Sequence, residues 1–291
     1  MTNSFLDYLA YEKRLSKHTT SAYANDLRQF GIYLQTDYEI TDTLQVDYQM
    51  VRSWIVSLVE EKLSKRSVNR KIATLRSYYG FLVARNAINK NPMLRIQSLK
   101  TEKDLPKYVE EKALEKLLDV MEFEEGFPGL RDKLVLELLY GTGIRLAELL
   151  GLKTLDIDHY NQQLKVLGKR NKERIIPMTN VLAKLVKEYL EERKNIFVED
   201  DTLITTDKGK AAYPMFIQRL IKEKLSSVTS LKQKSPHVLR HSFATHLLNN
   251  GAELNAIKDL LGHSSLSATQ IYAHNSIDKL KRVFNQAHPK A

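Results

Sequence analysis

The sequence predicts a mainly helical protein of two domains, with one small β-sheet in the second domain. In the first hundred residues, apolar side chains recur at steps of three and four, as they do on one face of an α-helix. Two short segments of strand composition flank residues 168–172, which predicts a hairpin with a long loop. Residues 100–106 are polar and lack an apolar period, so we expect them to link domains 1–99 and 107–291.

The first domain is expected to contain four helices. The first carries Leu6, Leu9 and Leu15, and the second follows Ser16, with apolar residues at helical spacing between 19 and 34. The third, over 48–61, has one apolar side, made of Val51, Ile55, Leu58 and Val59.

The fourth helix is the clearest of the four. Ser64 can cap its N-terminus, and Asn91 precedes a proline, which disfavours helical geometry and predicts an end there. Its apolar residues recur at alternating steps of four and three, which indicates one buried stripe. They are Val68, Ile72, Leu75, Tyr79 and Leu82.

The second domain is expected to open with helices, continue through the hairpin and end in helices. Gly141 and Gly143 stop the second of these helices, because glycine relieves backbone strain where a helix ends. Strands are predicted at 163–167 and 173–178. Helices are predicted at 109–121, 131–140, 145–150, 181–193, 213–225, 238–249 and 253–261.

The chain is strongly basic. Its 291 residues include 45 Lys and Arg against 35 Asp and Glu, a formal charge of +10, which favours a polyanionic partner: nucleic acid or an anionic membrane surface. No stretch of about 18 apolar residues, signal peptide or basic amphipathic helix with exposed aromatic residues is apparent, which favours nucleic acid. Cysteine is absent, which excludes disulfides and thiolate metal sites and suits a cytoplasmic protein.

Six residues of the second domain have the chemistry of phosphoryl transfer. A phenol can attack phosphorus, guanidinium and imidazole groups can hold phosphate oxygens, and an ammonium can protonate a leaving alkoxide. The six are Arg145, Lys169, His237, Arg240, His263 and Tyr272.

Each of the six also has an ordinary interpretation. Arg145 and Glu148 could form a surface ion pair worth under about 1 kcal/mol. Lys169 could belong to a solvated turn, His237 and Arg240 to an exposed helix face, and His263 to a helix end. Tyr272 is one of fourteen tyrosines. Only the joint occurrence of the six, in this order, points to catalysis.

Five segments carry a resemblance to a known family. They are residues 141–152, 168–177, 235–246, 260–263 and 269–274. On these motifs the chain resembles the tyrosine recombinases of the phage integrase superfamily over nearly its whole length, and its short length and C-terminal sequence resemble the Xer branch. Ala147 and Arg170 depart from the usual serine and glycine, neither of them at a catalytic position.

The resemblance implies a helical, SAM-like core-binding domain followed by a catalytic domain in which the six residues form the active site. Tyr272 is then expected to form a 3′-phosphotyrosyl link with DNA, without ATP, metal or any other cofactor. In the Xer branch this chemistry resolves chromosome dimers at cell division. An integrase of a phage or mobile element, using the same residues, is the alternative; a non-catalytic regulator is disfavoured because all six positions are retained.

The expected partner is double-stranded DNA. The resemblance implies a tetramer on paired sites, with a second Xer-type recombinase and a septal DNA translocase as further candidate partners. The terminal segment 276–286, with an apolar stripe ending at Phe284, would dock on a neighbouring subunit or pack on its own domain. Basic residues of the fourth helix and of the hairpin loop would contact DNA, or simply form solvated surface. They are Lys65, Arg66, Arg70, Lys71, Arg76, Arg170 and Lys172.

Overall fold

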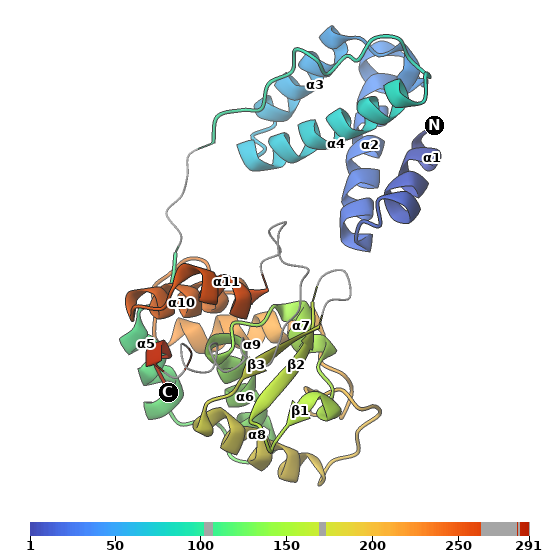
Figure 1. Cartoon of the computed structure of the whole chain (residues 1–291). Coiled ribbons are helices and arrows are strands. Elements are labelled where there is room, and N and C mark those ends of the chain that lie inside the picture. The colour runs from blue at the N-terminus through green and yellow to red at the C-terminus, as the bar shows by residue number, and fades with distance from the viewer. Residues whose placement is uncertain (102–106, 169–172, 263–283, 285, 291) are drawn as a thin grey trace. The chain divides into compact units, whose positions relative to one another are not determined.

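The structure is a computed structural model that describes residues 1–101, 107–168, 173–262, 284 and 286–290. The chain divides into two compact units, Met1–Asp104 and Leu105–Ala291 (Figure 1). Most described residues are helical, and one three-stranded antiparallel sheet lies in the second unit. Among the described residues, no helix has the length and apolar character needed to cross a lipid bilayer.

The first unit is a bundle of helices. Ser64 caps the fourth helix, as predicted, by accepting a hydrogen bond from the backbone N–H of Ser67, and Ser16 and Asp47 cap two others in the same way. A π-helical turn, Tyr8–Glu12, and a 3₁₀ turn, Thr43–Gln45, connect the helices. The helices are α1 (Thr2–Asp7), α2 (Lys17–Tyr38), α3 (Tyr48–Glu60) and α4 (Lys65–Ala84).

The core of the first unit confirms the predicted stripe of α4, whose five apolar residues are fully buried. Two expectations about its other helices are wrong. Val59 is exposed and Trp54 takes its place on the buried side of α3, against Phe30 of α2. Leu15 lies at the surface, whereas Phe5 is buried.

The prediction that α4 continues to Asn91 is also wrong. The helix ends at Ala84, where Asn86 adopts a left-handed conformation with φ 54°. The N–H groups of Ala87 and Asn86 then donate to the carbonyls of Leu82 and Val83. This pair of bonds satisfies the last carbonyls of the helix, so the chain turns away before it reaches the proline.

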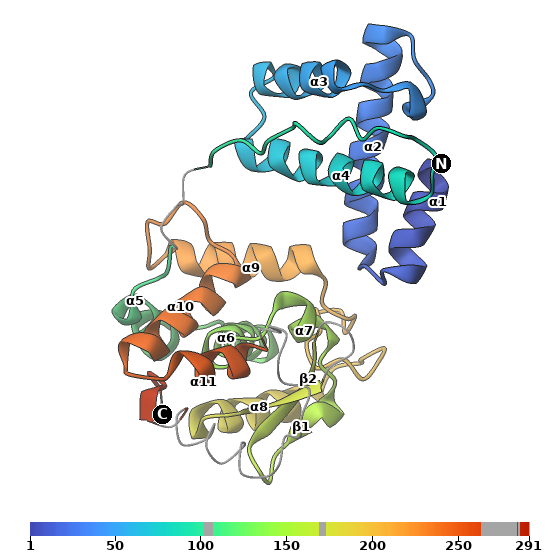
Figure 2. The same cartoon turned by 45° about the horizontal axis from the view of Figure 1, so that its top comes forward.

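The second unit surrounds one central helix, α6 (Phe127–Gly141). Its side chains, Leu134, Leu138 and Leu139 among them, are buried almost all round. The remaining helices are α5 (Glu111–Glu115), continued by the π-helical turn Lys116–Val120, α7 (Leu146–Gly151), α8 (Asn180–Arg193), α9 (Pro214–Ser226), α10 (Pro236–Asn249) and α11 (Leu254–Leu261). In both views α6 lies between α9 and α10 on one side and α8 on the other (Figures 1 and 2).

The sheet has the order β1-β2-β3. The predicted hairpin is confirmed: β2 (Gln163–Leu167) and β3 (Glu173–Pro177) are antiparallel, and Leu167 pairs with Glu173 at the base of the loop. A further strand, β1 (Ile157–Asp158), pairs with β2 and was not predicted. Two residues are too short to show a period in the sequence.

A sharp turn at Gly143 connects α6 to α7. Gly143 has φ 62°, and a Cβ there would lie 2.5 Å from Phe243 and 2.8 Å from Leu261. Both the backbone angle and the close approach therefore require glycine. The turn therefore packs closely on Phe243 of α10 and Leu261 of α11, and Arg145 follows two residues later.

Replacing Gly143 by alanine is expected to lower the free energy of unfolding by about 1–3 kcal/mol, from backbone strain and overpacking together. The matched control is Gly151→Ala at the end of α7, where a Cβ would meet nothing within 4 Å and φ is ordinary. Urea denaturation of both variants measures the difference. Equal stability of the two would show that the turn adapts to a side chain.

The described residues at the C-terminus pack on the second unit of the same chain. Phe284 and Ala287 are buried in its core, and the His288 ring donates from Nε2 to the carbonyl of Gly141 at 2.9 Å. Lys290 forms ion pairs with Glu137 and Asp119. The described part of the predicted terminal segment 276–286, residues 284 and 286, therefore belongs to its own domain here; the rest lies outside the described residues.

Acid is expected to release this C-terminal contact. Burial lowers the pKa of His288 from 6.5 to about 4, against the hydrogen bond to the Gly141 carbonyl, and the positive charge of Lys290 lowers it further. Its Nδ1 accepts a hydrogen bond from the backbone N–H of Lys290, which it can do only while it is unprotonated. An unfolded histidine takes up its proton first, so this contribution to stability is present above pH 6.5 and is lost as the pH falls towards 4.

An NMR titration of the His288 ring is expected to give a pKa near 4, with amide exchange of the C-terminal residues rising as the pH falls through that window. His288→Gln is expected to abolish the pH dependence. A ring that titrates near 6.5 would instead indicate an exposed histidine.

Candidate active site

Arg145 is the N-terminal flanking residue of α7, where the chain leaves the Gly143 turn. Its backbone N–H donates to Glu148 Oε2 at 2.8 Å, and its Nη1 donates to Glu148 Oε1 at 2.7 Å. Glu148 is the third residue of α7, the position from which a glutamate side chain reaches back to the helix start. The start of α7 thus orients the guanidinium group of Arg145 through Glu148.

Glu148 is the centre of the network. Its side chain is 4% exposed and also accepts both terminal nitrogens of Arg174, on β3, at 2.8 and 2.9 Å. Burial alone would raise the pKa of Glu148, but the hydrogen bonds from Arg174 and Arg145 outweigh it and lower the pKa to about 2. The alternative of an ordinary surface ion pair is therefore wrong: the carboxylate is buried and shared by two arginines.

Arg240 is a buried cation on α10. It is 7% exposed, and its guanidinium donates to the carbonyls of Gly143 and of Leu261, the latter at 2.7 Å. Among the described residues it forms no ion pair. Burial, followed by the positive charge of Arg145, lowers its pKa to about 10, so it remains charged at neutral pH. The alternative that Arg240 belongs to an exposed helix face is therefore wrong.

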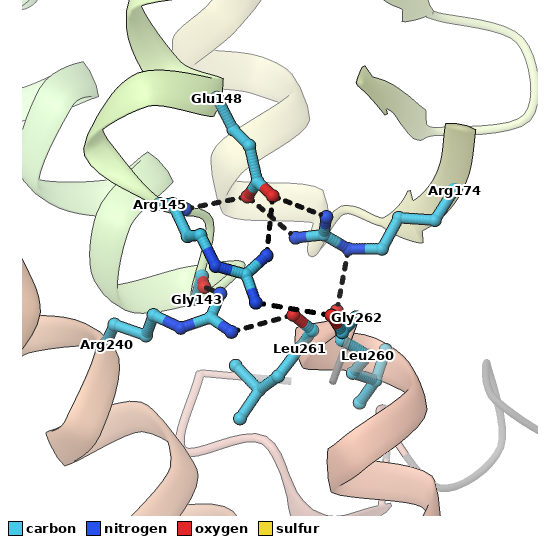
Figure 3. Close-up of polar contacts among 8 residues, drawn as sticks. All are labelled: Gly143, Arg145, Glu148, Arg174, Arg240, Leu260, Leu261 and Gly262. Carbon is cyan, nitrogen blue, oxygen red and sulfur yellow. Dashed lines mark hydrogen bonds and ion pairs between the residues drawn. The ribbon is translucent and has the colours of Figure 1, made fainter. Parts of the chain in front are cut away.

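The end of α11 brings the three arginines together (Figure 3). Three consecutive carbonyls accept from three different guanidinium groups: Leu260 from Arg174 at 3.0 Å, Leu261 from Arg240, and Gly262 from Arg145 at 3.2 Å. Carbonyls at a helix C-terminus carry partial negative charge and lack partners within the helix, so cations are favoured there. In sequence, Gly262 directly precedes His263.

His237 is exposed and follows Pro236, the first residue of α10. It lies on the same helix as Arg240, near an N-terminus that favours anions. His241 is partly buried, and burial and then the charge of His237 lower its pKa. His246 is buried and hydrogen-bonds through Nδ1 to Tyr140 at 2.9 Å, so it packs in the core.

Only part of the predicted site is described. Arg145 and Arg240 converge on adjacent carbonyls at the end of α11, and His237 lies one turn before Arg240. The remaining predicted residues of the site and of the hairpin loop lie outside the described part of the chain. They are Lys169, His263 and Tyr272, with Arg170 and Lys172.

The basic residues predicted on α4 do not form one uniform surface. Lys65 and Arg66 are exposed, and Arg76 is exposed with one bond to the carbonyl of Ile96. Arg70 is half-exposed and paired with Asp26, a buried carboxylate. The prediction that Lys71 contacts DNA is wrong. Its side chain is buried and its Nζ lies 3.0 Å from Asp26 Oδ1, so the ammonium group is not free to bind a DNA phosphate.

Sequence reasoning missed two residues that form buried ion pairs: Asp26, the partner of Arg70 and Lys71, and Arg174, the partner of Glu148. The sequence does contain a pattern that indicates the inward position of Arg174. Side chains of a strand alternate between faces, so an arginine two residues before the buried Ile176 points inward. A charge at an inward position requires a partner, which Glu148 provides.

Comparison with known proteins identifies relatives along the whole chain. Residues 107–278 match the model of the phage integrase family, and residues 2–86 match that of the phage integrase N-terminal SAM-like domain. The tyrosine recombinase XerC of Staphylococcus carnosus is 38% identical, covering 99% of this chain and 97% of its own. XerC of Listeria monocytogenes serotype 4b is 37% identical, covering 100% of this chain and 98% of its own.

A solved structure has the same fold. The site-specific recombinase XerH, crystallised with a palindromic difH substrate in a post-cleavage complex, superposes with a TM-score of 0.73 at 22% identity. The match covers 97% of this chain and 83% of that one.

Proposed function

This chain belongs to the phage integrase family and is a site-specific DNA recombinase, and we propose that Tyr272 is the nucleophile with which it cuts DNA. The proposed product is a 3′-phosphotyrosyl link, which a 5′-hydroxyl later attacks to rejoin the strands. Its relatives bear the name XerC. We therefore further propose that it resolves chromosome dimers, which would make it a cytoplasmic enzyme.

The observation that best supports this proposal is a buried arginine that has no acidic partner in the described part of the chain. Arg240 forms no ion pair among the described residues, and Arg145, which shares Glu148 with Arg174, lies close enough to affect its pKa. A guanidinium has five N–H donors, and each of these two has donors left over for an anion. Planar guanidinium groups match the oxygens of a phosphate, so a phosphodiester is the ligand that this pair fits.

In the proposed cleavage step, the Tyr272 oxygen bonds to phosphorus while the bond to the 5′-oxygen breaks. His237 assists removal of the phenolic proton and Lys169 supplies a proton to the leaving oxygen. Arg145, Arg240 and His263 bind the non-bridging oxygens, whose negative charge grows as the bond forms. The roles of Lys169, His263 and Tyr272 are inferred from their places in the sequence motifs.

The reverse step restores the DNA. A 5′-hydroxyl attacks the phosphotyrosyl link and the phenol leaves, so the two bonds exchanged are of the same type. No ATP is required, because the free energy of the phosphodiester is retained in the covalent intermediate. The protein's own cations supply the positive charge, so the proposed step requires neither a metal ion nor a cofactor.

Duplex DNA is the proposed partner. Four exposed basic residues of α4 can contact phosphates: Lys65, Arg66, Arg70 and Arg76. Lys71 cannot, because it is buried. The XerH structure contains a palindromic DNA substrate. By analogy we propose paired sites bound by four subunits, with a second Xer-type recombinase and a septal translocase as candidate partners. Docking of segment 276–286 on a neighbour would require release of the buried Phe284 contact.

A cleavage assay tests the proposal. Nicked duplexes that lose a short fragment after cleavage trap the covalent adduct, and the assay contains EDTA to remove divalent metal ions. One duplex carries the host's chromosome-terminus resolution site and the other the ends of a mobile element. An adduct on the first supports dimer resolution, and one only on the second supports the integrase alternative. No adduct on either would contradict the proposed chemistry.

A further inference from the structure

Arg174 touches three parts of the candidate active site at once. It lies on β3, just after the loop that contains Lys169, and its side chain is 12% exposed. Its two terminal nitrogens bind both oxygens of Glu148, and its Nε binds the carbonyl of Leu260 at the end of α11 (Figure 3). One side chain therefore connects the hairpin, the start of α7 and the end of α11.

The bonds of Arg174 determine what Glu148 can do for Arg145. A carboxylate can accept about four hydrogen bonds, and Glu148 receives two from Arg174 and two from Arg145. With Arg174 removed, the buried carboxylate would keep Arg145 as its one remaining cation. Arg145 would then be held more closely to Glu148 and would be less available to an anion.

Charge leads to the same conclusion. The cluster of Arg145, Arg174, Arg240 and Glu148 contains three cations and one anion, which leaves two positive charges. A phosphodiester carries one negative charge, and about one more develops on its oxygens as a phenolate adds. Without Arg174 only one net positive charge would face this increase, and preorganised charge is a main source of catalysis.

We propose that Arg174 is a positioning residue for DNA cleavage, which occupies Glu148 and thereby orients Arg145 and keeps it available to the scissile phosphate. This proposal rests on the proposed function, because it requires Arg145 to bind that phosphate. Arg174 itself does not contact the DNA. A purely structural role, in which Arg174 only fastens β3 to α11, is the competing explanation.

The test measures the single-turnover rate of adduct formation at saturating nicked duplex, and DNA affinity separately. Arg174→Met is expected to slow the rate by about 10- to 100-fold, the scale of a misplaced catalytic group, and to change the Kd by less than about 3-fold. Arg174→Lys keeps the charge but not the paired bonds, so its rate is expected to lie in between. Arg131→Met is the matched control: Arg131 is buried and binds Asp132 and Asp207, outside this network.

A double-mutant cycle with Glu148→Gln distinguishes positioning from structure. If Arg174 acts through Glu148, adding Arg174→Met to Glu148→Gln is expected to change the rate by less than about 3-fold. If Arg174 only fastens β3 to α11, the rate reductions caused by Arg174→Met and by Glu148→Gln are expected to multiply in the double variant.

Each outcome decides one proposal. A rate of Arg174→Met equal to that of Arg131→Met, or effects that multiply in the cycle, would overturn the positioning role while leaving the proposed function intact. No adduct from the unaltered chain would overturn the proposed function, and this inference with it. A Tm measured for every variant shows that the rates compare folded proteins.

Discussion

Arg240→Ala is expected to slow adduct formation by about 10²–10³-fold, the cost of removing one donor aimed at developing charge. The effect should fall on the rate at saturating DNA, because the charge on the non-bridging oxygens is greatest in the transition state. Arg240→Lys should rescue little. An ammonium is a point charge and cannot reproduce the planar bonds to the Gly143 and Leu261 carbonyls together with a phosphate contact.

The control for Arg240 is an arginine with the same kind of bonds elsewhere in the unit. Arg193 donates to the carbonyls of Asp200 and Thr202, at 3.1 and 2.7 Å, away from the cluster. Arg193→Ala should lower stability but leave the rate of adduct formation within about 3-fold of that of the unaltered chain, because Arg193 shares no partner with the arginine cluster. A methylphosphonate at the scissile position removes one negative charge from the DNA, so it should partly restore the rate of adduct formation by Arg240→Ala. An Arg240→Ala rate equal to that of Arg193→Ala would exclude Arg240 from phosphate binding.

Tyr272→Phe is expected to abolish the covalent adduct while DNA affinity is retained. The substitution removes one oxygen atom, and no other group of the predicted set can form the phosphotyrosyl bond. A denaturing gel with a nicked duplex measures the adduct, and a mobility-shift assay measures binding. Tyr160→Phe is the control, because Tyr160 is 94% exposed.

An undiminished adduct in Tyr272→Phe would assign the nucleophile to another residue. Proteolysis of the adduct and sequencing of the DNA-linked peptide would then identify it. Loss of both adduct and DNA binding would instead indicate that the variant is misfolded, which a thermal melt detects.

The helices of the first unit were largely predictable, because their apolar residues repeat at the helical period. The fourth-helix stripe and its serine cap were confirmed. The end of that helix was not found, because a left-handed asparagine stops it and that conformation has no reliable sequence signal. Strand β1 was missed because two residues cannot display a period.

The arginine cluster could be predicted only in part. Sequence motifs selected Arg145 and Arg240, but spacing alone made the pair of Arg145 and Glu148 resemble a surface ion pair. The buried position of this pair depends on Arg174, which lies 26 positions after Glu148 and binds its carboxylate. It also depends on the Gly262 carbonyl at the end of α11, which binds Arg145. These partners are brought together only by the fold. Lys71 illustrates the same limit, since its partner Asp26 lies on another helix.

The central claim is that two guanidinium groups at the end of α11 meet one scissile phosphate. The most direct measurement is a structure of Tyr272→Phe bound to uncleaved DNA. It is expected to show one phosphate within about 2.7–3.1 Å of nitrogens of both Arg145 and Arg240, with residue 272 facing its phosphorus. A phosphate bound away from these two arginines, or a residue 272 that cannot reach it from its own or a neighbouring subunit, would contradict the account.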